Sequence, residues 1–560
     1  MSGYYQEEFT PEETSVLNRF VTNTDLPVFG LINLPEVVKG ALFARYSRSA
    51  KSLRRLLLDE FINDEDTGIE TLALNIEDDP MVAMRRAEDL YKRVFFEYGD
   101  DSVAQLGGAH LACEQASNLL TKVLEWGRLA AYLEQSTRYI RYDAKLGDSY
   151  RYFTPDEIVK SKHADHYRKH KEYVFDEYSS LVSEMIGVFE QRHPRAESDS
   201  KMIYNATIRA KACDTVRGLL PVSTTSNVGI YATGQAYEMA LVRMQASPLA
   251  EVRDYGQMML AELRKVIPSF LTRVDLPDRG VRWSGYLEGV RNELEALASE
   301  LPQPADSGPS VTLTDWDEDA ETKIAAAALY AVSELPDAAL QKMAAAMSPA
   351  EKAQIVAAMV GDRENRRHRP GRPMERTTYR FDVSCDIGAF RDLQRHRLMT
   401  LEWQKFSTRL GYDVPDEIEE LGHSERWTAT MDSAGELYEA VRDDLGADIA
   451  QYVVPFAYNV RFIMEMNPRQ AFHLIELRSQ PAGHPAYRRV AHEMHAAIRE
   501  VAGHRLIADA MTFVDYSDVD LERLESERRT DQKRNSPSAG GGSTSDLRSE
   551  GRVGRSHQRL

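Results

Sequence analysis

Apolar residues recur at helical spacing along most of this chain and alternate along one shorter stretch. Residues 80–100 carry an amphipathic helical pattern, and residues 106–139, rich in small side chains, also read as helix. The strongly charged residues 145–215 predict a helical surface hairpin, and residues 320–362 predict alanine-rich helices. Residues 377–385 alternate as a strand does. The pattern therefore predicts a helix-rich protein that also contains sheet.

Breaks in this pattern divide the chain. Residues 1 to about 40 are polar and contain three prolines, which predicts an extended arm. Residues 301–319 are rich in Pro, Ser, Gly and Asp and predict a linker. Residues 527–560 are Gly/Ser-rich and nearly free of apolar side chains, which predicts a disordered tail. We therefore expect a first domain over residues 1–300 and a second over residues 320–526.

Composition narrows the class of protein. A chain of 560 residues exceeds the roughly 250–300 residues at which single cores stop growing, so more than one domain is expected. No apolar run has membrane-spanning length and the start lacks the regions of a signal peptide, which predicts a cytoplasmic protein without a membrane anchor. The three cysteines lie far apart, and His, Cys and carboxylates form no metal-ligand spacing, so we expect no disulfide frame and no metal site.

The formal charge of −19 argues against specific or broad nucleic-acid binding, because that affinity depends on neutralising phosphates. A small anion is still a suitable ligand, since a local group of arginines sets the field within a cleft.

Such a group occurs twice. Residues 391–409 read RDLQRHRLMTLEWQKFSTR, with Arg395, His396 and Arg397 in sequence and Ser407 and Arg409 further along. Residues 125–139 read EWGRLAAYLEQSTRY and contain the second set, which comprises Arg128, Glu134, Ser136, Thr137, Arg138 and Tyr139. Arginine suits phosphate, because its planar fork donates paired hydrogen bonds and stays charged.

Both stretches resemble the signature of flavin-dependent thymidylate synthases, in which Arg-His-Arg is followed after seven residues by Ser and then x-Arg-Tyr. Nine residues separate Arg397 from Ser407, and Leu410 stands where Tyr belongs. In the earlier stretch, Trp126 and Gly127 replace the Arg-His pair. The resemblance therefore indicates a tandem duplication whose two copies are each incomplete.

Further positions resemble the family in the same order in both copies. In the first copy these are Ser47, Ser102, Arg217 just before Leu-Leu-Pro, and Arg243 at the end of a predicted helix. In the second they are Glu375, Pro455, Asn467, His473 and Arg478, with Gln451 where the first copy has Arg217. The second copy thus lacks one arginine that the family uses to face the nucleotide.

The resemblance implies an α+β fold, an antiparallel sheet flanked by helices, in two tandem domains. Members of the family are homotetramers with active sites between subunits. Two copies in one chain therefore predict a homodimer that resembles a tetramer, with each site drawing on both halves.

The resemblance also implies the chemistry, reductive methylation of dUMP to dTMP with FAD as cofactor and with methylenetetrahydrofolate and NADPH as co-substrates. It implies catalytic roles for Arg138, Ser136 and Arg243. It implies substrate contacts for Arg128, Glu134, Thr137, Arg217, Arg409 and Arg478. It implies cofactor contacts for Ser47, Ser102, Glu375, Arg395, His396, Arg397, Asn467 and His473. None of the three cysteines lies in the Pro-Cys-His motif of the thiol-dependent thymidylate synthases, which favours the flavin route.

Two other functions stay open at this stage. Asp100, Gln105 and Gly127 depart from the family pattern, which leaves room for a flavoenzyme of the same fold acting on another pyrimidine nucleotide. A non-catalytic nucleotide-binding scaffold is the other alternative. The sequence also leaves open whether both copies contribute to catalysis.

Overall fold

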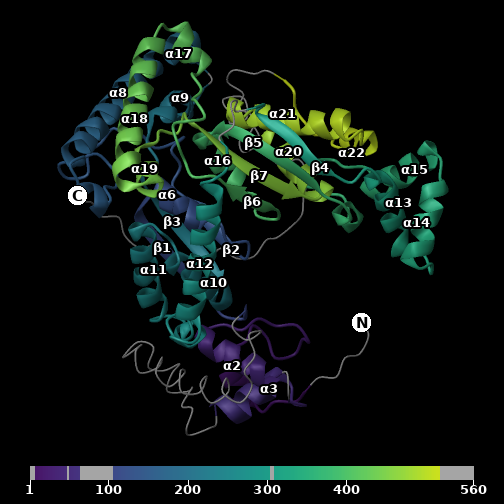
Figure 1. The fold of residues 1–560 in the computed structure, drawn as a ribbon. Helices are drawn as coiled ribbons and strands as arrows, with labels where there is room; N and C mark the ends of the chain where they lie inside the picture. Colours follow the sequence, from purple (N-terminus) through teal and green to yellow (C-terminus); the bar gives the residue numbers. More distant parts are fainter. Residues whose placement is uncertain (1–6, 47–48, 63–104, 198, 303–307, 518–560) are drawn as a thin grey trace.

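The computed structural model describes residues 7–46, 49–62, 105–197, 199–302 and 308–517. The predicted helix over 80–100, the predicted tail and the candidates Ser47 and Ser102 lie outside these residues. The described part is an α+β protein with two antiparallel sheets and many helices, as predicted (Figure 1).

The first sheet has the order β1-β3-β2, formed by β1 (Gly108–Ser117), β3 (Thr225–Thr233) and β2 (Ala130–Glu134). In the register, Gly108 lies opposite Thr233 and Ala130 opposite Ala232. The helix predicted over residues 106–139 was therefore wrong: only α6 (Asn118–Leu124) is helical there, between two strands. Small residues such as those of β1 fit either a helix or a strand. They form a strand here because β1 pairs with β3, which also pairs with β2 on its other side.

The second sheet has the order β4-β5-β7-β6, formed by β4 (Val311–Trp316), β5 (Tyr379–Asp386), β7 (Asn459–Met466) and β6 (Thr400–Trp403). The strand predicted from the alternation over 377–385 is β5. Part of the predicted linker is itself a strand, because β4 pairs with β5 along Val311–Trp316.

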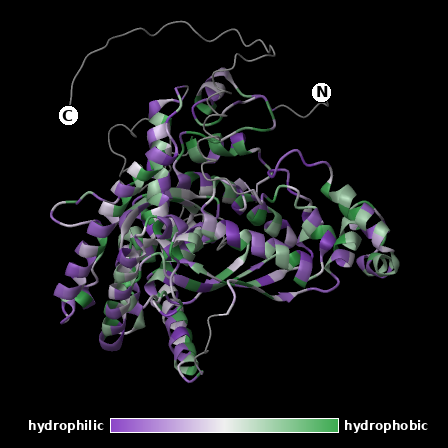
Figure 2. Cartoon of the chain, turned by 90° about the horizontal axis from the view of Figure 1, so that it is seen from above, coloured by the Kyte–Doolittle hydropathy of each residue, from purple (hydrophilic) through white to green (hydrophobic). Residues whose placement is uncertain are grey.

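Helices cover both sheets (Figure 1). Those of the first half are α7 (Asp156–Val159), α8 (Ala164–Arg192), α9 (Lys201–Val216), η3 (Arg217–Leu219), α10 (Gly234–Gln245), α11 (Ala250–Leu263), η4 (Pro268–Leu271) and α12 (Gly280–Ala298). Those of the second half are η5 (Arg372–Glu375), α16 (Ile387–Gln394), α17 (Asp416–Glu420), α18 (Ser424–Leu445), α19 (Ala447–Ala450), η6 (Gln451–Val453), α20 (Pro468–Arg478), α21 (Pro485–Ala496), η7 (Ala497–Val501) and α22 (Arg505–Asp509). The predicted surface hairpin is α8 with α9, and the predicted alanine-rich helices are α13 (Ala320–Tyr330), α14 (Asp337–Ala346) and α15 (Pro349–Val360). Apolar and polar residues alternate along most of these helices, as packing on one face requires (Figure 2).

The predicted N-terminal arm is folded rather than extended. It contains α1 (Pro11–Leu17) and α2 (Glu36–Tyr46), followed by α3 (Leu53–Leu56) and η1 (Leu57–Ile62). Thr10 closes a capping box on Glu13, which starts α1 despite the short apolar pattern. Leu17, Phe20 and Val21 are buried, so the polar composition of this stretch concealed a small core.

The two halves repeat one another and meet on equivalent residues. The order β1, α6, β2, α8, η3, β3, α10 recurs as β5, α16, β6, α18, η6, β7, α20. Pro221 lies opposite Pro455 in an antiparallel bridge. The Val222 N–H donates to the Val454 carbonyl at 2.8 Å, and the Phe456 N–H donates to the Leu220 carbonyl at 2.9 Å. A local two-fold axis therefore passes between the prolines, and the seam between the halves lies on both sides of it.

Candidate active site

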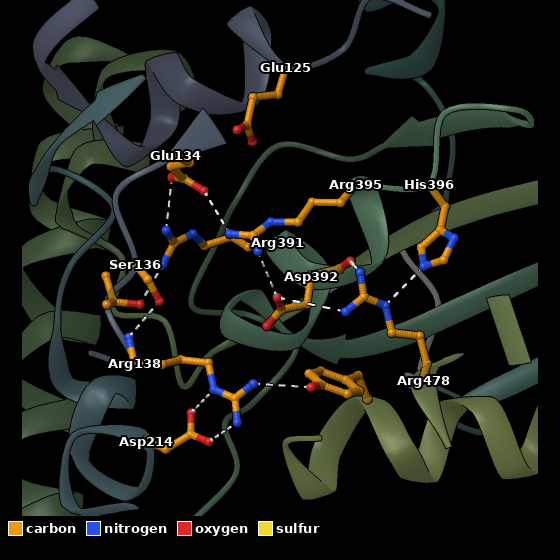
Figure 3. Close-up of polar contacts among 12 residues, drawn as sticks. Glu125, Glu134, Ser136, Arg138, Asp214, Arg391, Asp392, Arg395, His396 and Arg478 are labelled. Atoms are coloured by element: carbon orange, nitrogen blue, oxygen red, sulfur yellow. Dashed lines mark hydrogen bonds and ion pairs between the residues drawn. The ribbon is translucent and has the colours of Figure 1, made fainter. Parts of the chain in front are cut away.

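Glu134, at the end of β2, holds arginines of the other half. Its carboxylate accepts a hydrogen bond from Arg391 of α16 at 2.8 Å and lies 3.5 Å from Arg395, just beyond that helix (Figure 3). Lys122 of α6 lies 3.7 Å away. Burial alone raises the pKa of Glu134, but Arg391, Lys122 and Arg395 outweigh it and lower the pKa to about 2. Glu134 is therefore an anion fixed across the seam.

Thr137 and Ser136 follow Glu134 and take different partners. The Thr137 hydroxyl accepts from Arg391 at 3.0 Å, so it too contacts the second half. The Ser136 hydroxyl accepts the backbone N–H of Arg138 at 3.2 Å, which fixes the turn that aims Arg138 (Figure 3).

Arg138 and Arg217 share one carboxylate. Arg138 donates twice to Asp214 of α9, at 3.0 and 2.6 Å, and once to the Tyr487 hydroxyl of α21 at 3.2 Å (Figure 3). Arg217 lies 3.4 Å from Asp214, and burial is outweighed by the cations so that the pKa of Asp214 falls to about 2. The turn after β2 and the end of α9 are thus joined to a helix of the second half.

In the second half, Asp392 of α16 is the carboxylate around which several arginines lie. It lies 3.5 Å from Arg217, 3.5 Å from Arg395 and 3.9 Å from Arg478 of α20. Burial raises its pKa, and these cations more than reverse that rise. Asp392 therefore stays charged and connects arginines of both halves.

His396 is held neutral beside these cations. Arg478 Nε donates to His396 Nε2 at 2.9 Å, and an arginine has only protons to give, so Nε2 carries none. Burial and the charge of Arg478 lower the pKa of His396 well below its usual range. The Arg-His-Arg triplet directly follows α16, which ends at Gln394.

These ion pairs form one connected network, which we call the seam cluster. Its cations are Lys122, Arg138, Arg217, Arg391, Arg395 and Arg478, and its carboxylates are Glu125, Glu134, Asp214 and Asp392. Six cations face four carboxylates, so the described part of the cluster carries two excess positive charges. Arg217 Nη2 and Arg391 Nε are buried without a hydrogen-bond partner. Buried donors left in this state are costly, so these two nitrogens are open to a hydrogen-bond acceptor.

Two further arginines lie near the cluster without a carboxylate among the described residues. The Arg243 guanidinium lies 4.9 Å from the Trp126 ring, and burial lowers the pKa of Arg243. The Arg397 guanidinium lies 5.3 Å from the Tyr132 ring, and its Nη1 is buried without a partner. Arg128 is exposed and donates to the Thr400 hydroxyl at 3.2 Å.

The other predicted site residues are more dispersed. Asn467 caps α20 by accepting from Gln470 N–H at 2.9 Å, and Glu375 pairs with Arg469 at 3.1 Å. The His473 ring lies 5.2 Å from that of His396, and burial together with nearby arginines lowers the pKa of His473 to about 4. Arg409 lies apart from the seam cluster, in a two-point ion pair with Glu439 of α18 at 2.9 and 2.8 Å.

Sequence reasoning missed Lys122, Asp214, Arg391, Asp392 and Tyr487. A signal was present, because Lys122–Glu125, Asp214–Arg217 and Asp392–Arg395 are each opposite charges three residues apart, the spacing that brings side chains together on one helical turn.

The equivalent place across the two-fold axis differs in its side chains and keeps fewer of the charges of the seam cluster. Trp126 stands where Arg395 stands, and its indole N–H donates to the Leu401 carbonyl at 3.2 Å. Gln451 stands where Arg217 stands and accepts from Phe406 N–H at 3.0 Å. Lys405 neutralises Asp448 at 2.9 Å. Lys405 and Asp448 therefore satisfy one another, while Arg243 on Trp126 is a cation of this place without a carboxylate among the described residues.

Among the described residues, no helix is long and apolar enough to cross a bilayer, and no three His, Cys, Asp or Glu side chains are grouped to hold a metal. The fold and the site together define a tandem α+β protein with a buried cluster of ion pairs between its halves. The chain belongs to the family described as thymidylate synthase complementing protein, which matches residues 46–269 and 312–503. The predicted family and its tandem arrangement are confirmed, since the two matched ranges fall in the two halves.

Two relatives match this chain over nearly their whole length. A UPF0159 protein of Chlamydia muridarum is 38% identical over 527 residues, covering 93% of this chain and 98% of the relative. A UPF0159 protein of Thermoplasma acidophilum is 30% identical over 523 residues, covering 88% of this chain and 99% of the relative. Among solved structures, the UMP/dUMP methylase PolB of Streptomyces cacaoi, bound to 5-Br dUMP, is 19% identical with a TM-score of 0.29, covering 36% of this chain and 93% of PolB.

Proposed function

We propose that this protein is a flavin-dependent thymidylate synthase that methylates dUMP to dTMP, with methylenetetrahydrofolate as carbon donor and NADPH as reductant. The observation that carries the proposal is the seam cluster, whose six cations exceed its four carboxylates by two. A nucleotide 5′-phosphate carries close to two negative charges at neutral pH, so it balances this excess. Family membership supplies the pyrimidine nucleotide as the bearer of that phosphate.

Arg217 and Arg391 are the best placed to bind the phosphate. Each is buried and keeps one guanidinium nitrogen without a hydrogen-bond partner. The other nitrogens of Arg217 lie beside Asp214 and Asp392, and those of Arg391 donate to Thr137 and Glu134. Donors held in advance lose little conformational entropy on binding, which favours tight phosphate recognition.

The residues around Arg397 suit an anionic, partly aromatic cofactor such as FAD. Arg397 offers a buried Nη1 without a partner, and neutral His396 lies one residue earlier. Arg395 is half-exposed at the edge of the seam cluster. When bound, FAD supplies the hydride that reduces the transferred carbon. Arg395, His396 and Arg397 would hold it.

Arg243 is suited to a second task in the reaction. Transfer of carbon to the uracil ring develops negative charge on the ring, and cations held in a dry site stabilise that charge. Arg138 is occupied by Asp214 and Tyr487, whereas Arg243 has no carboxylate among the described residues and rests on Trp126. Arg243 would therefore face the ring while the seam cluster binds the phosphate.

Calorimetry on the full chain tests the proposal most directly. Titration with dUMP, with UMP and with deoxyuridine should give the tightest binding for dUMP and at least about a hundredfold weaker binding for deoxyuridine, which lacks the phosphate. A flavin absorbance band in the purified protein and formation of dTMP from labelled methylenetetrahydrofolate should accompany this result.

Three outcomes would contradict the proposal. Tighter binding of UMP than dUMP would favour a different pyrimidine nucleotide. Nucleotide binding without any flavin uptake would favour a scaffold. Equal affinity for dUMP and deoxyuridine would remove the phosphate from the seam cluster.

A further inference from the structure

Helix α12 exposes a continuous apolar stripe. Its members are Trp283, Tyr286, Val290, Leu294 and Leu297, which are 41%, 63%, 39%, 60% and 61% exposed. Intervals of three and four residues place all of them on one side of a helix. A group of large apolar side chains exposed together on a surface commonly marks an interaction site.

The rest of the molecule attaches to α12 by a different side. The Ser284 hydroxyl donates to the Val242 carbonyl of α10 at 3.1 Å, and Arg291 donates to the Ala246 carbonyl at the end of α10. Figure 1 shows α12 beside α10 at one margin of the first half. The helix is therefore anchored by polar contacts, and the side chains of its apolar stripe remain 39–63% exposed.

In the sequence, α12 lies outside both copies of the family pattern. It spans Gly280–Ala298, between the two ranges matched by the family, residues 46–269 and 312–503. Its stripe is thus an addition to the two catalytic copies rather than a part of either.

We propose that the stripe binds the same stripe of a second copy of this chain, with the two helices antiparallel about a two-fold axis at Val290. This arrangement places Trp283 against Leu297 of the second copy and Tyr286 against its Leu294. Aromatic and aliphatic side chains then face each other at both ends, so the surface is complementary to itself as an isologous contact requires.

The charges beside the stripe favour the antiparallel direction. Arg282 lies near the start of α12 and Glu293 near its end, and Glu300 follows two residues beyond Ala298. Antiparallel pairing brings Arg282 close to Glu300 of the second copy, whereas parallel pairing leaves these opposite charges at opposite ends of the contact. Two arginines and four glutamates over residues 280–301 also make the helix acidic, which disfavours the anionic lipid surface that such stripes otherwise bind.

Cysteine cross-linking tests the position of the axis. Val290→Cys should give a disulfide-linked dimer of the full chain under mild oxidation, because the two residues meet at the axis. Cys113, Cys213 and Cys385 are buried, so the background should be low. The matched control is Val332→Cys, since Val332 is 79% exposed and lies far along the chain from α12. Equal cross-linking of both variants, or none in Val290→Cys, would overturn the proposal.

Sedimentation and dUMP titration complete the test. Leu294→Glu should convert a dimer into a folded monomer, with far-UV circular dichroism and dUMP affinity unchanged. Arg282→Glu should weaken the dimer at least tenfold, and Arg282→Glu with Glu300→Arg should restore it. A monomeric wild type, or a dimer indifferent to Leu294→Glu, would overturn the inference. Loss of nucleotide binding in every variant and in the wild type would count against the proposed function instead.

Discussion

Glu134 shows how one side chain can control the stability of the seam. It is fully buried among Arg391, Lys122 and Arg395, which hold its pKa near 2 rather than 4.5. Replacing it by glutamine leaves these cations without their counter-charge. Removal of one partner of a buried pair typically costs about 3–5 kcal/mol. We expect Glu134→Gln to lower the free energy of unfolding by this amount, measured by urea denaturation at pH 7.

The same carboxylate predicts how stability depends on pH. Its folded pKa is depressed, so its contribution is present above the unfolded pKa of about 4.5 and is lost as the pH falls toward 2. The contribution is on the order of 3 kcal/mol. Unfolding free energy of the wild type should therefore drop steeply between about pH 4.5 and 2, and Glu134→Gln should show a shallower drop. Identical slopes in the two proteins would contradict this account.

Arg138 and Arg409 form a natural pair for testing nucleotide binding. Both donate twice to a carboxylate, but Arg138 does so inside the seam cluster and Arg409 on an exposed surface. Loss of one charge-assisted contact costs about 1.5–3 kcal/mol. Arg138→Ala leaves Asp214 to draw on Arg217, which we propose binds the phosphate. This substitution should therefore weaken dUMP binding roughly 10- to 150-fold by calorimetry, and Arg409→Ala should leave it unchanged. The reverse ranking would move the substrate to the second half.

Strand β2 and the turn before it carry different side chains from the equivalent strand and turn of the second half. A Cβ added at Gly127 would meet the Tyr132 hydroxyl oxygen at 2.6 Å. In the second half the equivalent positions are His396 and Leu401, since Tyr132 lies opposite Ile230 and Leu401 opposite Met464 at matching places of β3 and β7. One half thus pairs a glycine with a tyrosine, and the other pairs an imidazole with a leucine.

The close approach of Gly127 and Tyr132 can be tested by mutation. Gly127→Ala should lower the free energy of unfolding by about 1–3 kcal/mol, because overpacking forces the phenol aside. Tyr132→Phe removes the oxygen that collides, so the double variant should recover most of the loss in thermal denaturation. Additive losses in the double variant would show that the two positions do not touch.

Elements with a strong local pattern could be predicted from the sequence, and elements defined by distant partners could not. Strand β5 alternates, and α8, α9 and the alanine-rich helices follow helical spacing, so local pattern sufficed. Strand β1 was mistaken for helix because its alanines and glycines carry no period of their own and β3 supplies its pairing from more than a hundred residues away. The site divides in the same way: Glu134 and Arg395 were found from a motif, whereas Asp214 and Asp392 belong to the site only because the halves meet.

At the scale of the whole molecule, the two halves are duplicated but carry different side chains, and this predicts how many nucleotides one chain binds. The seam cluster has six cations, while the place related to it by the two-fold axis holds Trp126, Gln451 and the Lys405–Asp448 pair. We therefore expect one dUMP per chain in calorimetric titrations of protein with a known active fraction. Two equivalent sites per chain would show that the second place binds nucleotide despite its fewer charges.

The backbone hydrogen bonds beside Pro221 and Pro455 cannot form until both halves of the chain have been synthesised. Val222 and Val454, which one of these bonds joins, are about 230 residues apart. At translation rates of about 5–20 residues per second, the first half waits roughly 10–50 s for its counterpart. During that interval Glu134 has no arginine from α16, and the backbone at Leu220–Val222 lacks its partner. A ribosome-bound first half should therefore recruit chaperones until the second half emerges, and an isolated copy expressed alone should aggregate.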